Sequence, residues 1–335
     1  MHKTVGQLLE DTNEFFHWLN SASISLVVFK AVIESGIVDR LVAAPATLAE
    51  LAAVSGIPAD KVGRLVNVLA AHELVELAAG GHVVGKPSVT VLKAVTPAID
   101  MAAFGTLSAG LELCSALREG ITPFEKRFGK PVFAYFADDP AMAATFVEFM
   151  TFQTRRAQDF IFTRHPLPPF APAVDVGGSQ GVLLSEVLAH HPGARGVLFD
   201  LPEVVERVSG KLAELPNGDR IAAVGGSFFE AVPAADLYLL KQILHDWTDP
   251  ECVRILQAIR SAIMPGGRIV VIDCLLGDTP ETNEALFIDI AMMIWSTGRE
   301  RKLSEFERLF DASGFRLERV SENPRGQSVI EAVPV

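Results

Sequence analysis

The chain has 335 residues, of which 49% are hydrophobic and 21% charged, a composition too apolar for a disordered protein. At about 150 residues per domain, this length predicts two domains that need no disulfide or metal to hold them together. The formal net charge of −12 would repel phosphate backbones, so nucleic acid is not expected as a main partner. The mean hydropathy of +0.31 is high for a soluble protein, and a large apolar interface between subunits would account for it.

The same sequence argues against a membrane span and against export. The longest stretch without a charged residue, Phe15 to Phe29, is shorter than the roughly 18 to 20 apolar residues that a span requires. Residues 1–14 lead into acidic side chains rather than an apolar block, so no secretory signal is expected. Cys114, Cys252 and Cys274 are scattered and spell no metal-ligand spacing, which suits a reducing compartment. We therefore expect a cytoplasmic protein with no membrane partner and no metal.

Residues 15–84 carry apolar side chains mostly at helical spacing, which predicts an all-α region. Thr47 followed by Glu50 is the pattern of a capping box at the start of a helix. A turn at 55–58 precedes a second helix expected over 59–73. The segments 74–77 and 82–84 then flank Gly80 and Gly81 as a short hairpin. Helix, turn, helix and hairpin together predict a winged helix.

Winged helices often bind DNA, which would need a basic stripe on the second helix. That helix offers only Lys61, Arg64 and His72, and residues 1–100 contain seven basic and ten acidic side chains. We therefore expect residues 1–100 to have a structural, dimerising role.

Residues 101–170 are expected to form a helical bridge between the two domains that contributes to the substrate pocket. It ends in the stiff, proline-rich connector 166–172. Beyond it, over 171–335, short apolar runs alternate with helices, the pattern of a doubly wound parallel α/β sheet. The expected strands, with helices between them, are 173–176, 195–200, 221–224, 236–240 and 268–273. The last two strands, 315–321 and 328–333, flank Asn323-Pro-Arg-Gly with no room for a helix, so the sheet should end in an antiparallel pair.

A glycine-rich loop, Asp175-Val-Gly-Gly-Ser-Gln-Gly181, follows the first of these strands. Glycines there let the backbone approach a ligand closely, and the helix N-terminus that follows favours negative charge. Asp200 ends the second strand, where a carboxylate can bond the hydroxyl pair of a ribose. The loop matches neither the dinucleotide fingerprint nor a Walker A loop. The sequence thus predicts a nucleoside cofactor, with a turn that merely packs the helix onto the sheet as the alternative.

Blocks along nearly the whole chain resemble the small-molecule O-methyltransferases that use S-adenosylmethionine, the group shared by plant caffeate-type and bacterial secondary-metabolite enzymes. They are the winged helix, the glycine loop, Phe199-Asp-Leu-Pro202, Gly225-Gly-Ser-Phe-Phe229, Leu240-Lys-Gln-Ile-Leu-His-Asp-Trp247, Pro265-Gly-Gly267 and Gly298-Arg-Glu-Arg301. The resemblance implies that the cofactor is held by Gly177, Asp200, Ser227, Phe228 and Lys241. It also implies substrate contacts from Phe149, Met150, Trp247, Met292, Met293 and Trp295.

Further implications of the resemblance concern assembly and departures from the pattern. The N-terminal helices would embrace the second subunit of a homodimer. Ser179 stands where the family generally has a third glycine, and Ser227 where it often has an aspartate. Serine can still accept a hydrogen bond, but without the strength that a charge adds.

His245 follows the strand 236–240 and Asp273 ends the next strand, at the carboxyl edge where ligands of open α/β folds bind. If the two strands are neighbours, both side chains reach the same crevice. Methyl transfer to a phenol needs a base, because a phenol with a pKa of about 10 is mostly protonated at neutral pH. A neutral imidazole with a pKa of about 6.5 can take that proton. By the resemblance, Asp273 and Glu300 are the carboxylates that stabilise the resulting imidazolium.

The sequence therefore predicts a homodimeric S-adenosylmethionine-dependent O-methyltransferase, acting on a hydroxyl of a small aromatic or polyketide-like metabolite. Its general base is His245, while His17, His82, His190 and His191 are expected to have no role in the site. Two alternatives stay open. One is a C- or N-methyltransferase, or a decarboxylase, on the same fold. The other is a ligand-sensing winged-helix repressor, which would show salt-dependent DNA retention.

Overall fold

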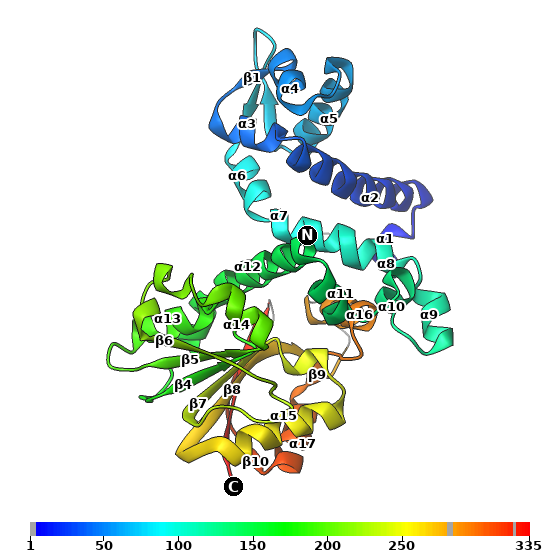
Figure 1. The fold of residues 1–335 in the computed structure, drawn as a ribbon. Coiled ribbons are helices and arrows are strands. Elements are labelled where there is room, and N and C mark those ends of the chain that lie inside the picture. The colour runs from blue at the N-terminus through cyan, green and yellow to red at the C-terminus, as the bar shows by residue number, and fades with distance from the viewer. Residues whose placement is uncertain (1–4, 280–283, 324–325) are drawn as a thin grey trace. The chain divides into compact units, whose positions relative to one another are not determined.

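The computed structural model describes residues 5–279, 284–323 and 326–335, except for the side chain of Asp159. The chain divides into two compact units, Met1–Phe104 and Gly105–Val335, which are described separately below (Figure 1). The functional division expected at residues 100 and 170 stays a prediction. The expected turn at Pro324 and Arg325 lies outside the described residues, as do residues 1–4.

The N-terminal unit has the order of elements expected of a winged helix. Its helices are α1 (Val5–Leu8), α2 (Thr12–Glu34), α3 (Ile37–Ala43), α4 (Leu48–Ser55), α5 (Ala59–Ala71), α6 (Pro87–Ala94) and α7 (Thr96–Met101). The strand β3 (His82–Gly85) pairs antiparallel with both β1 (Ala46–Thr47) and β2 (Val75–Leu77). The predicted capping box is confirmed, since the Glu50 carboxylate accepts a hydrogen bond from the Thr47 amide at 2.7 Å and the Thr47 hydroxyl accepts from the Glu50 amide. The helix α5 ends before the predicted residue 73 because Glu73 has a φ of 56°, outside the helical region.

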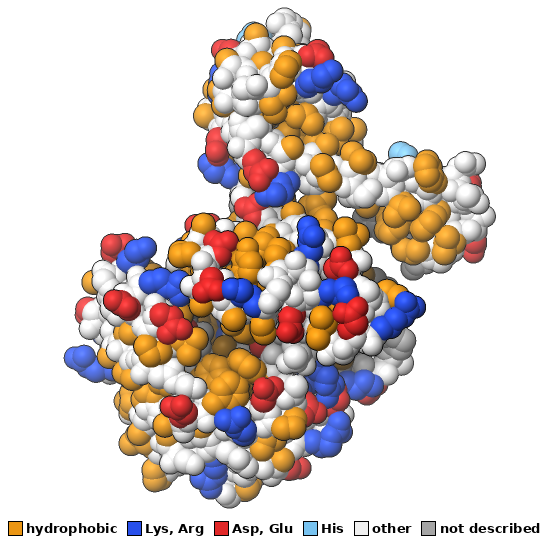
Figure 2. All heavy atoms as spheres, turned by 45° about the vertical axis from the view of Figure 1, so that its right-hand side comes forward, with side chains coloured by type: hydrophobic (Ala, Val, Ile, Leu, Met, Phe, Trp, Pro, Cys, Tyr) orange, Lys and Arg blue, Asp and Glu red, His pale blue; other side chains and the backbone are white. Residues whose placement is uncertain are grey.

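The helix α2 is much less buried than its apolar sequence would suggest. Its N-cap Asp11 accepts a hydrogen bond from the Asn13 amide at 2.8 Å, and the helix then continues past Lys30, the residue that ended the uncharged stretch. By length and composition alone it could cross a membrane, which the sequence analysis did not predict. Its side chains at Phe16 and Val27 are 65% and 62% exposed. Figure 2 shows hydrophobic side chains, in orange, gathered on the surface of this unit.

The C-terminal unit begins with a run of helices ahead of its sheet. A π-helical segment at Ala102–Leu107 spans the division between the two units along the chain. It is followed by α8 (Ser108–Gly110), α9 (Leu113–Glu119), α10 (Pro123–Phe128), α11 (Val132–Asp138) and α12 (Pro140–Arg164). The later helices are α13 (Val182–His190), α14 (Pro202–Val208), α15 (Asp249–Ala262), α16 (Glu284–Trp295) and α17 (Leu303–Ser313). Short 3₁₀ turns lie at Leu212–Glu214, Gly218–Arg220 and Leu244–Asp246. As predicted, residues 166–172 form neither helix nor strand.

The sheet of this unit has the strand order β6-β5-β4-β7-β8-β11-β10. Its strands are β4 (Ala173–Val176), β5 (Gly196–Asp200), β6 (Ile221–Gly225), β7 (Ala235–Lys241), β8 (Ile263–Leu276), β10 (Phe315–Ser321) and β11 (Gln327–Pro334), and β9 (Arg301–Lys302) pairs with the end of β8. The strands β4 to β8 run parallel, while β11 is antiparallel to both β8 and β10. The predicted antiparallel end of the sheet is therefore confirmed.

Helices cover both faces of the sheet, as a doubly wound fold requires (Figure 1). Alternate side chains of a strand point to opposite faces. Leu237 and Leu239 of β7 pack into a core with α12 and α13, whereas Tyr238 and Leu240 pack into a core with α15 and α17. These two cores hold the sheet rigid and so fix the positions of the residues at its carboxyl edge.

One expectation about the sheet is wrong. The sequence predicted helices between all the parallel strands, but the described residues 226–234 between β6 and β7 form no helix. This segment is short, opens with Gly226 and contains Pro233, so it lacks the length and the residues of a stable helix. From β6, at one edge of the sheet, the chain crosses here to β7, which lies on the other side of β4. The direction in which successive strands are added to the sheet therefore reverses between β4 and β7. Such a switch point is where open α/β sheets bind ligands.

Candidate active site

The loop after β4 forms a cradle that only small residues can line. Gly177 has a φ of 69°, and a Cβ atom there would come within 2.5 Å of the Ile243 side chain. A Cβ atom at Gly178 would come within 2.8 Å of the Asp175 carboxylate. Both glycines line a pocket that is also lined by Met150 of α12 and by Lys241 of β7. Two predicted cofactor residues, Gly177 and Lys241, thus face the same hollow.

The departure from the family pattern at Ser179 has a visible consequence in the backbone. Ser179 has a φ of 52°, in the left-handed region that glycine adopts without strain. A side chain in that conformation costs about 1–2 kcal/mol. The Ser179 amide donates a hydrogen bond to Oδ2 of Asp200 at 2.9 Å. The strained residue therefore ties the glycine loop to the end of β5.

The residues expected around the nucleoside follow the ends of β5 and β6, which are neighbours. Oδ1 of Asp200 accepts a hydrogen bond from the Leu201 amide at 2.7 Å. Asp200 pairs in register with Gly225, and two residues later Ser227 lines a second hollow. The Ser227 hydroxyl accepts a hydrogen bond from the Phe229 amide at 3.3 Å. The ring of Phe228, the next residue after Ser227, lies edge-on to Trp247 at 5.9 Å.

Two buried ionisable side chains flank the switch point, Asp175 in β4 and Lys241 at the end of β7. Burial raises the pKa of Asp175 to about 7, against the charge of Lys241, and its Oδ2 has no hydrogen-bond partner among the described residues. Burial lowers the pKa of Lys241 to about 8, against the carboxylates of Asp273 and Asp175. The Lys241 ammonium donates to Oε1 of Gln242 at 2.6 Å. An orphaned carboxylate oxygen beside the pocket suits a ligand that carries hydrogen-bond donors.

Asp175 was not among the site residues expected from the sequence. It lies between Val174 and Val176 in a strand whose residues are all buried. A carboxylate in the middle of a parallel, fully buried strand is itself a signal, because such groups are costly to bury without a partner.

His245 lies in the 3₁₀ turn Leu244–Asp246 that follows β7, and its imidazole is buried. Its Nδ1 lies 2.7 Å from Oε1 of Glu300, and its Nε2 lies 3.7 Å from Oδ1 of Asp246. Glu300 is anchored in turn, since its backbone amide donates to Asp289 at 2.9 Å. A proton on Nδ1 shared with Glu300 leaves Nε2 as the atom that can accept a proton from a ligand.

Asp273, the other expected support of His245, is fully buried in β8, and β7 and β8 are neighbours as the sequence argument required. Neither of its carboxylate oxygens has a hydrogen-bond partner within the described parts of the chain. Burial raises the pKa of Asp273, against the charge of His245. In this structure, Asp273 therefore acts on His245 through its charge rather than through a hydrogen bond.

The protonation of His245 differs from the simple expectation. Burial lowers its pKa, but the carboxylates of Asp246, Glu300 and Asp273 outweigh this and raise the pKa to about 10. An unperturbed histidine has a pKa of about 6.5. The imidazole is thus a stronger base than a free histidine, and it is mostly protonated at neutral pH in this structure.

The expected substrate contacts fall into different environments. Phe149 and Met292 are half-buried, and Met293 is 37% exposed. Trp247 stacks on Phe133 with ring centroids 6.0 Å apart.

Trp295, the last of the expected substrate contacts, is engaged in the packing of the C-terminal unit. Its ring stacks on Phe124 at 5.4 Å, and its indole N–H donates to Thr106 at 3.2 Å. This cluster of aromatic side chains also includes Phe136. Of the six expected contacts, Met150 is the one that lines the cofactor-side pocket.

The other histidines differ in their exposure. His17, His82 and His190 are exposed and His191 is half-buried, and their expected lack of a role stays a prediction. His165, which the sequence analysis did not consider, is fully buried with its Nε2 2.9 Å from Glu331. This pair lies on β11 and the end of α12, and nothing in the sequence spacing of the two residues predicts it.

Comparisons with known proteins identify the family. The protein-family model for the O-methyltransferase domain matches residues 111–316 of this chain. Phenazine O-methyltransferase PhzM of Lysobacter antibioticus is 34% identical over 307 residues, which cover 90% of each chain. The crystal structure of LaPhzM has a TM-score of 0.90 at 31% identity, covering 96% of this chain and 99% of that one. CalO1, a methyltransferase in calicheamicin biosynthesis solved with SAH bound, has a TM-score of 0.82 at 30% identity, covering 98% and 99%.

The residues at the switch point fit S-adenosylmethionine. Gly177 and Gly178 line a hollow beside the end of β4, and a Cβ atom at Gly177 would collide with the Ile243 side chain. Asp175 offers an orphaned acceptor, and Asp200 stands at the end of β5 where a ribose can be bound. Together with the matches to the family, the fold and these residues lead to one conclusion. The chain belongs to the family of S-adenosylmethionine-dependent O-methyltransferases.

Proposed function

We propose that this enzyme methylates a hydroxyl group of a small aromatic or polyketide-like metabolite, with His245 as the general base. The observation that carries the proposal is the 2.7 Å contact between Nδ1 of His245 and Glu300, which keeps a proton on Nδ1 and makes Nε2 the accepting atom of the neutral ring, in a buried site beside the switch point. The name of the phenazine O-methyltransferase and the calicheamicin pathway of CalO1 support an acceptor of this kind.

Each side chain of the proposed site has a separate task. Glu300 accepts a hydrogen bond from Nδ1–H and so holds the ring in one orientation. Nε2 takes the proton of the acceptor hydroxyl, and the nearby carboxylates of Asp246 and Asp273 stabilise the imidazolium that forms. The bound cofactor supplies an electrophilic methyl group. Burial of the imidazole keeps water away from it and strengthens these electrostatic interactions.

The proposed cofactor contacts run along the carboxyl edge of the sheet. Gly177 and Lys241 would hold the methionine side, and Asp200 would bind the ribose. Ser227 and Phe228 would flank the adenine. On the acceptor side we propose Phe149, Met150, Trp247, Met292 and Met293 as apolar contacts, with Trp295 supporting them through its aromatic cluster.

The direct test is incubation with methyl-labelled S-adenosylmethionine and a panel of phenols, quinols and polyketides. We expect one acceptor to gain a labelled methyl group on oxygen, located by mass fragmentation of the product. Label on carbon or nitrogen would instead identify a C- or N-methyltransferase. Loss of carbon dioxide from an acceptor without transfer of label would identify a decarboxylase, and either result would overturn the proposal.

The proposal includes a homodimer formed through the N-terminal helices, in the cytoplasm. The exposed apolar side chains of α2, such as Phe16 and Val27, support a protein partner for this helix. The free thiols of Cys252 and Cys274 suit a reducing compartment.

Sedimentation should give twice the chain mass of 36.1 kDa for the wild type. Charged residues in the exposed apolar side of α2 should break the dimer, so the double substitution Phe16→Glu, Val27→Glu is expected to sediment as a monomer. Lys61→Glu on α5 is the control, because it alters an exposed charge on another helix of the same unit. A wild type that stays monomeric at high concentration would contradict this part of the proposal.

A further inference from the structure

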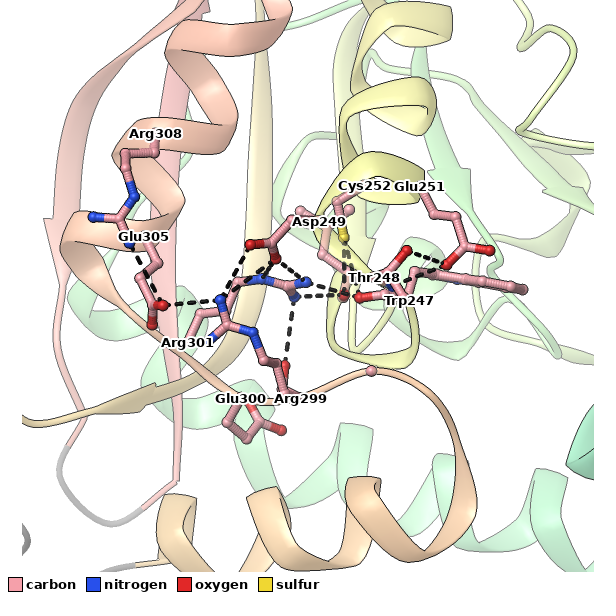
Figure 3. Close-up of polar contacts among 12 residues, drawn as sticks. Trp247, Thr248, Asp249, Glu251, Cys252, Arg299, Glu300, Arg301, Glu305 and Arg308 are labelled. Atoms are coloured by element: carbon pink, nitrogen blue, oxygen red, sulfur yellow. Dashed lines mark hydrogen bonds and ion pairs between the residues drawn. The ribbon is translucent and has the colours of Figure 1, made fainter. Parts of the chain in front are cut away.

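Arg301 is fully buried, which is rare for an arginine and calls for a reason. Its Nη1 donates to the carbonyl of Leu244 and its Nη2 to the carbonyl of Trp247, both at 2.7 Å. Its Nε and Nη2 also donate to Oδ1 of Asp249, at 2.9 and 2.8 Å. Figure 3 shows the guanidinium group of Arg301 next to Asp249 and Trp247. The two carbonyls flank His245 in the chain, so the Arg301 side chain is hydrogen-bonded to the backbone on both sides of His245.

Two neighbours of Arg301 reach the same turn. A Cβ atom at Gly298 would lie 1.9 Å from the carbonyl oxygen of His245, so only glycine fits there. Glu300 accepts from Nδ1 of His245 at 2.7 Å. We call Gly298, Glu300 and Arg301 the turn clamp. Its three members fix the backbone at His245, the ring of His245, and the backbone on either side of it.

Stability alone does not account for the buried guanidinium. Burying a charge is costly, and an apolar residue of similar volume often serves a core equally well. The one carboxylate that Arg301 contacts among the described residues, Asp249, has a side chain that is 50% exposed, which weakens the ion pair. What a hydrocarbon side chain could not reproduce is the planar fork of donors that engages two carbonyls at once.

We propose that Arg301 is a positioning residue for methyl transfer: by holding the carbonyls of Leu244 and Trp247 it keeps the turn Leu244–Asp246 in the one conformation that presents Nε2 of His245 to the acceptor. This inference rests on the proposed role of His245 as the base. It extends the catalytic apparatus to a side chain that touches neither the ligand pocket nor the reacting atoms.

The test is the pair of substitutions Arg301→Met and Arg301→Lys. Methionine has a similar apolar volume without donors, and lysine keeps the charge but cannot engage both carbonyls with a fixed fork. Misplacing a catalytic group by about 1 Å costs up to about 100-fold in rate. We expect kcat to fall about 10- to 100-fold in Arg301→Met and by a smaller factor in Arg301→Lys. The Kd for S-adenosylhomocysteine, measured by calorimetry, should stay within about threefold, because Arg301 does not line the cofactor-side pocket.

Rates are divided by the number of cofactor-binding sites and measured well below the melting temperature, so that unfolded protein does not count. Arg299→Met is the matched control. Arg299 lies two residues before Arg301, its side chain is 41% exposed, and it pairs with Asp249 and Glu305 without reaching either carbonyl. We expect its kcat to equal that of the wild type.

If Arg301→Met does not fold, Gly298→Ala tests the same clamp from its other end, because the added methyl group must displace the carbonyl of His245. It should show the same loss of kcat with unchanged binding of S-adenosylhomocysteine. A folded Arg301→Met protein with a lower melting temperature but wild-type kcat per binding site would overturn the inference and leave Arg301 a structural residue. Failure of the proposed function looks different, since then the wild type transfers no methyl group to oxygen or His245→Ala remains fully active.

Discussion

Replacing His245 with alanine is expected to lower kcat by about 10²- to 10⁴-fold, the usual contribution of a positioned general base. The imidazole is buried against Glu300, and no other histidine of the described chain lies in this turn. Binding of the cofactor should be unaffected, because His245 is not part of the pocket lined by Gly177 and Lys241. Single-turnover transfer of labelled methyl measures the rate, and calorimetry with S-adenosylhomocysteine measures the binding.

The matched control for this substitution is His190→Ala. His190 is exposed on the same unit. Among the hydrogen bonds of the described residues, its Nδ1 makes one, with the carbonyl of Glu186 in the same helix at 3.0 Å. It should keep wild-type kcat. If His245→Ala retained wild-type turnover, the base would have to be another group and the proposed mechanism would be wrong.

Replacing Glu300 with glutamine should lower the maximal rate by about 10²- to 10³-fold and move the pH dependence. Burial lowers the pKa of His245, while Asp246, Glu300 and Asp273 raise it to about 10, so the neutral base becomes more abundant as pH rises toward that value. Removing one carboxylate charge lowers this pKa. The ascending limb of the kcat profile should therefore move to lower pH, while its plateau falls because the imidazolium loses its charged partner.

The profile is measured from about pH 6 to pH 10 with saturating cofactor and acceptor. Glu305→Gln is the control, since Glu305 pairs with Arg299 at 2.8 Å and accepts from the Lys302 amide at the start of α17 without touching His245. It should lower stability slightly and leave the limb in place. A limb that stays at the wild-type position in Glu300→Gln, or moves to higher pH, would show that Glu300 does not control the ionisation of His245.

Local patterns in the sequence were enough to predict most of the fold. The capping box at Thr47 and the strand from Phe315 to Ser321 are read from neighbouring residues, and both are as predicted. The link 226–234 was mispredicted because a rule about alternating strands and helices was applied where the chain changes direction in the sheet. The order of the strands follows from how the chain crosses over, and no single segment carries that information.

The site was less accessible to sequence reasoning, because its properties depend on burial and on residues far apart in the chain. The motif around Glu300 pointed to the carboxylate that contacts His245, but the sequence cannot show that Arg301, one residue later, is buried. A buried and an exposed arginine look alike in a sequence. The pKa of His245 depends on three carboxylates brought together by the turn after β7, by β8 and by the segment before α17. The combined effect of these carboxylates on the pKa of His245 can therefore be deduced only from the folded structure.

The backbone at Ser179 matters for anyone who wishes to use this enzyme in preparative chemistry. The residue holds a conformation that costs an L-amino acid about 1–2 kcal/mol, while its contact with Asp200 is made by the amide and not by the hydroxyl. Glycine would keep that amide and remove the cost, although it also makes the unfolded chain more flexible. Position 179 is therefore the natural first site in an effort to obtain a sturdier biocatalyst without altering its chemistry.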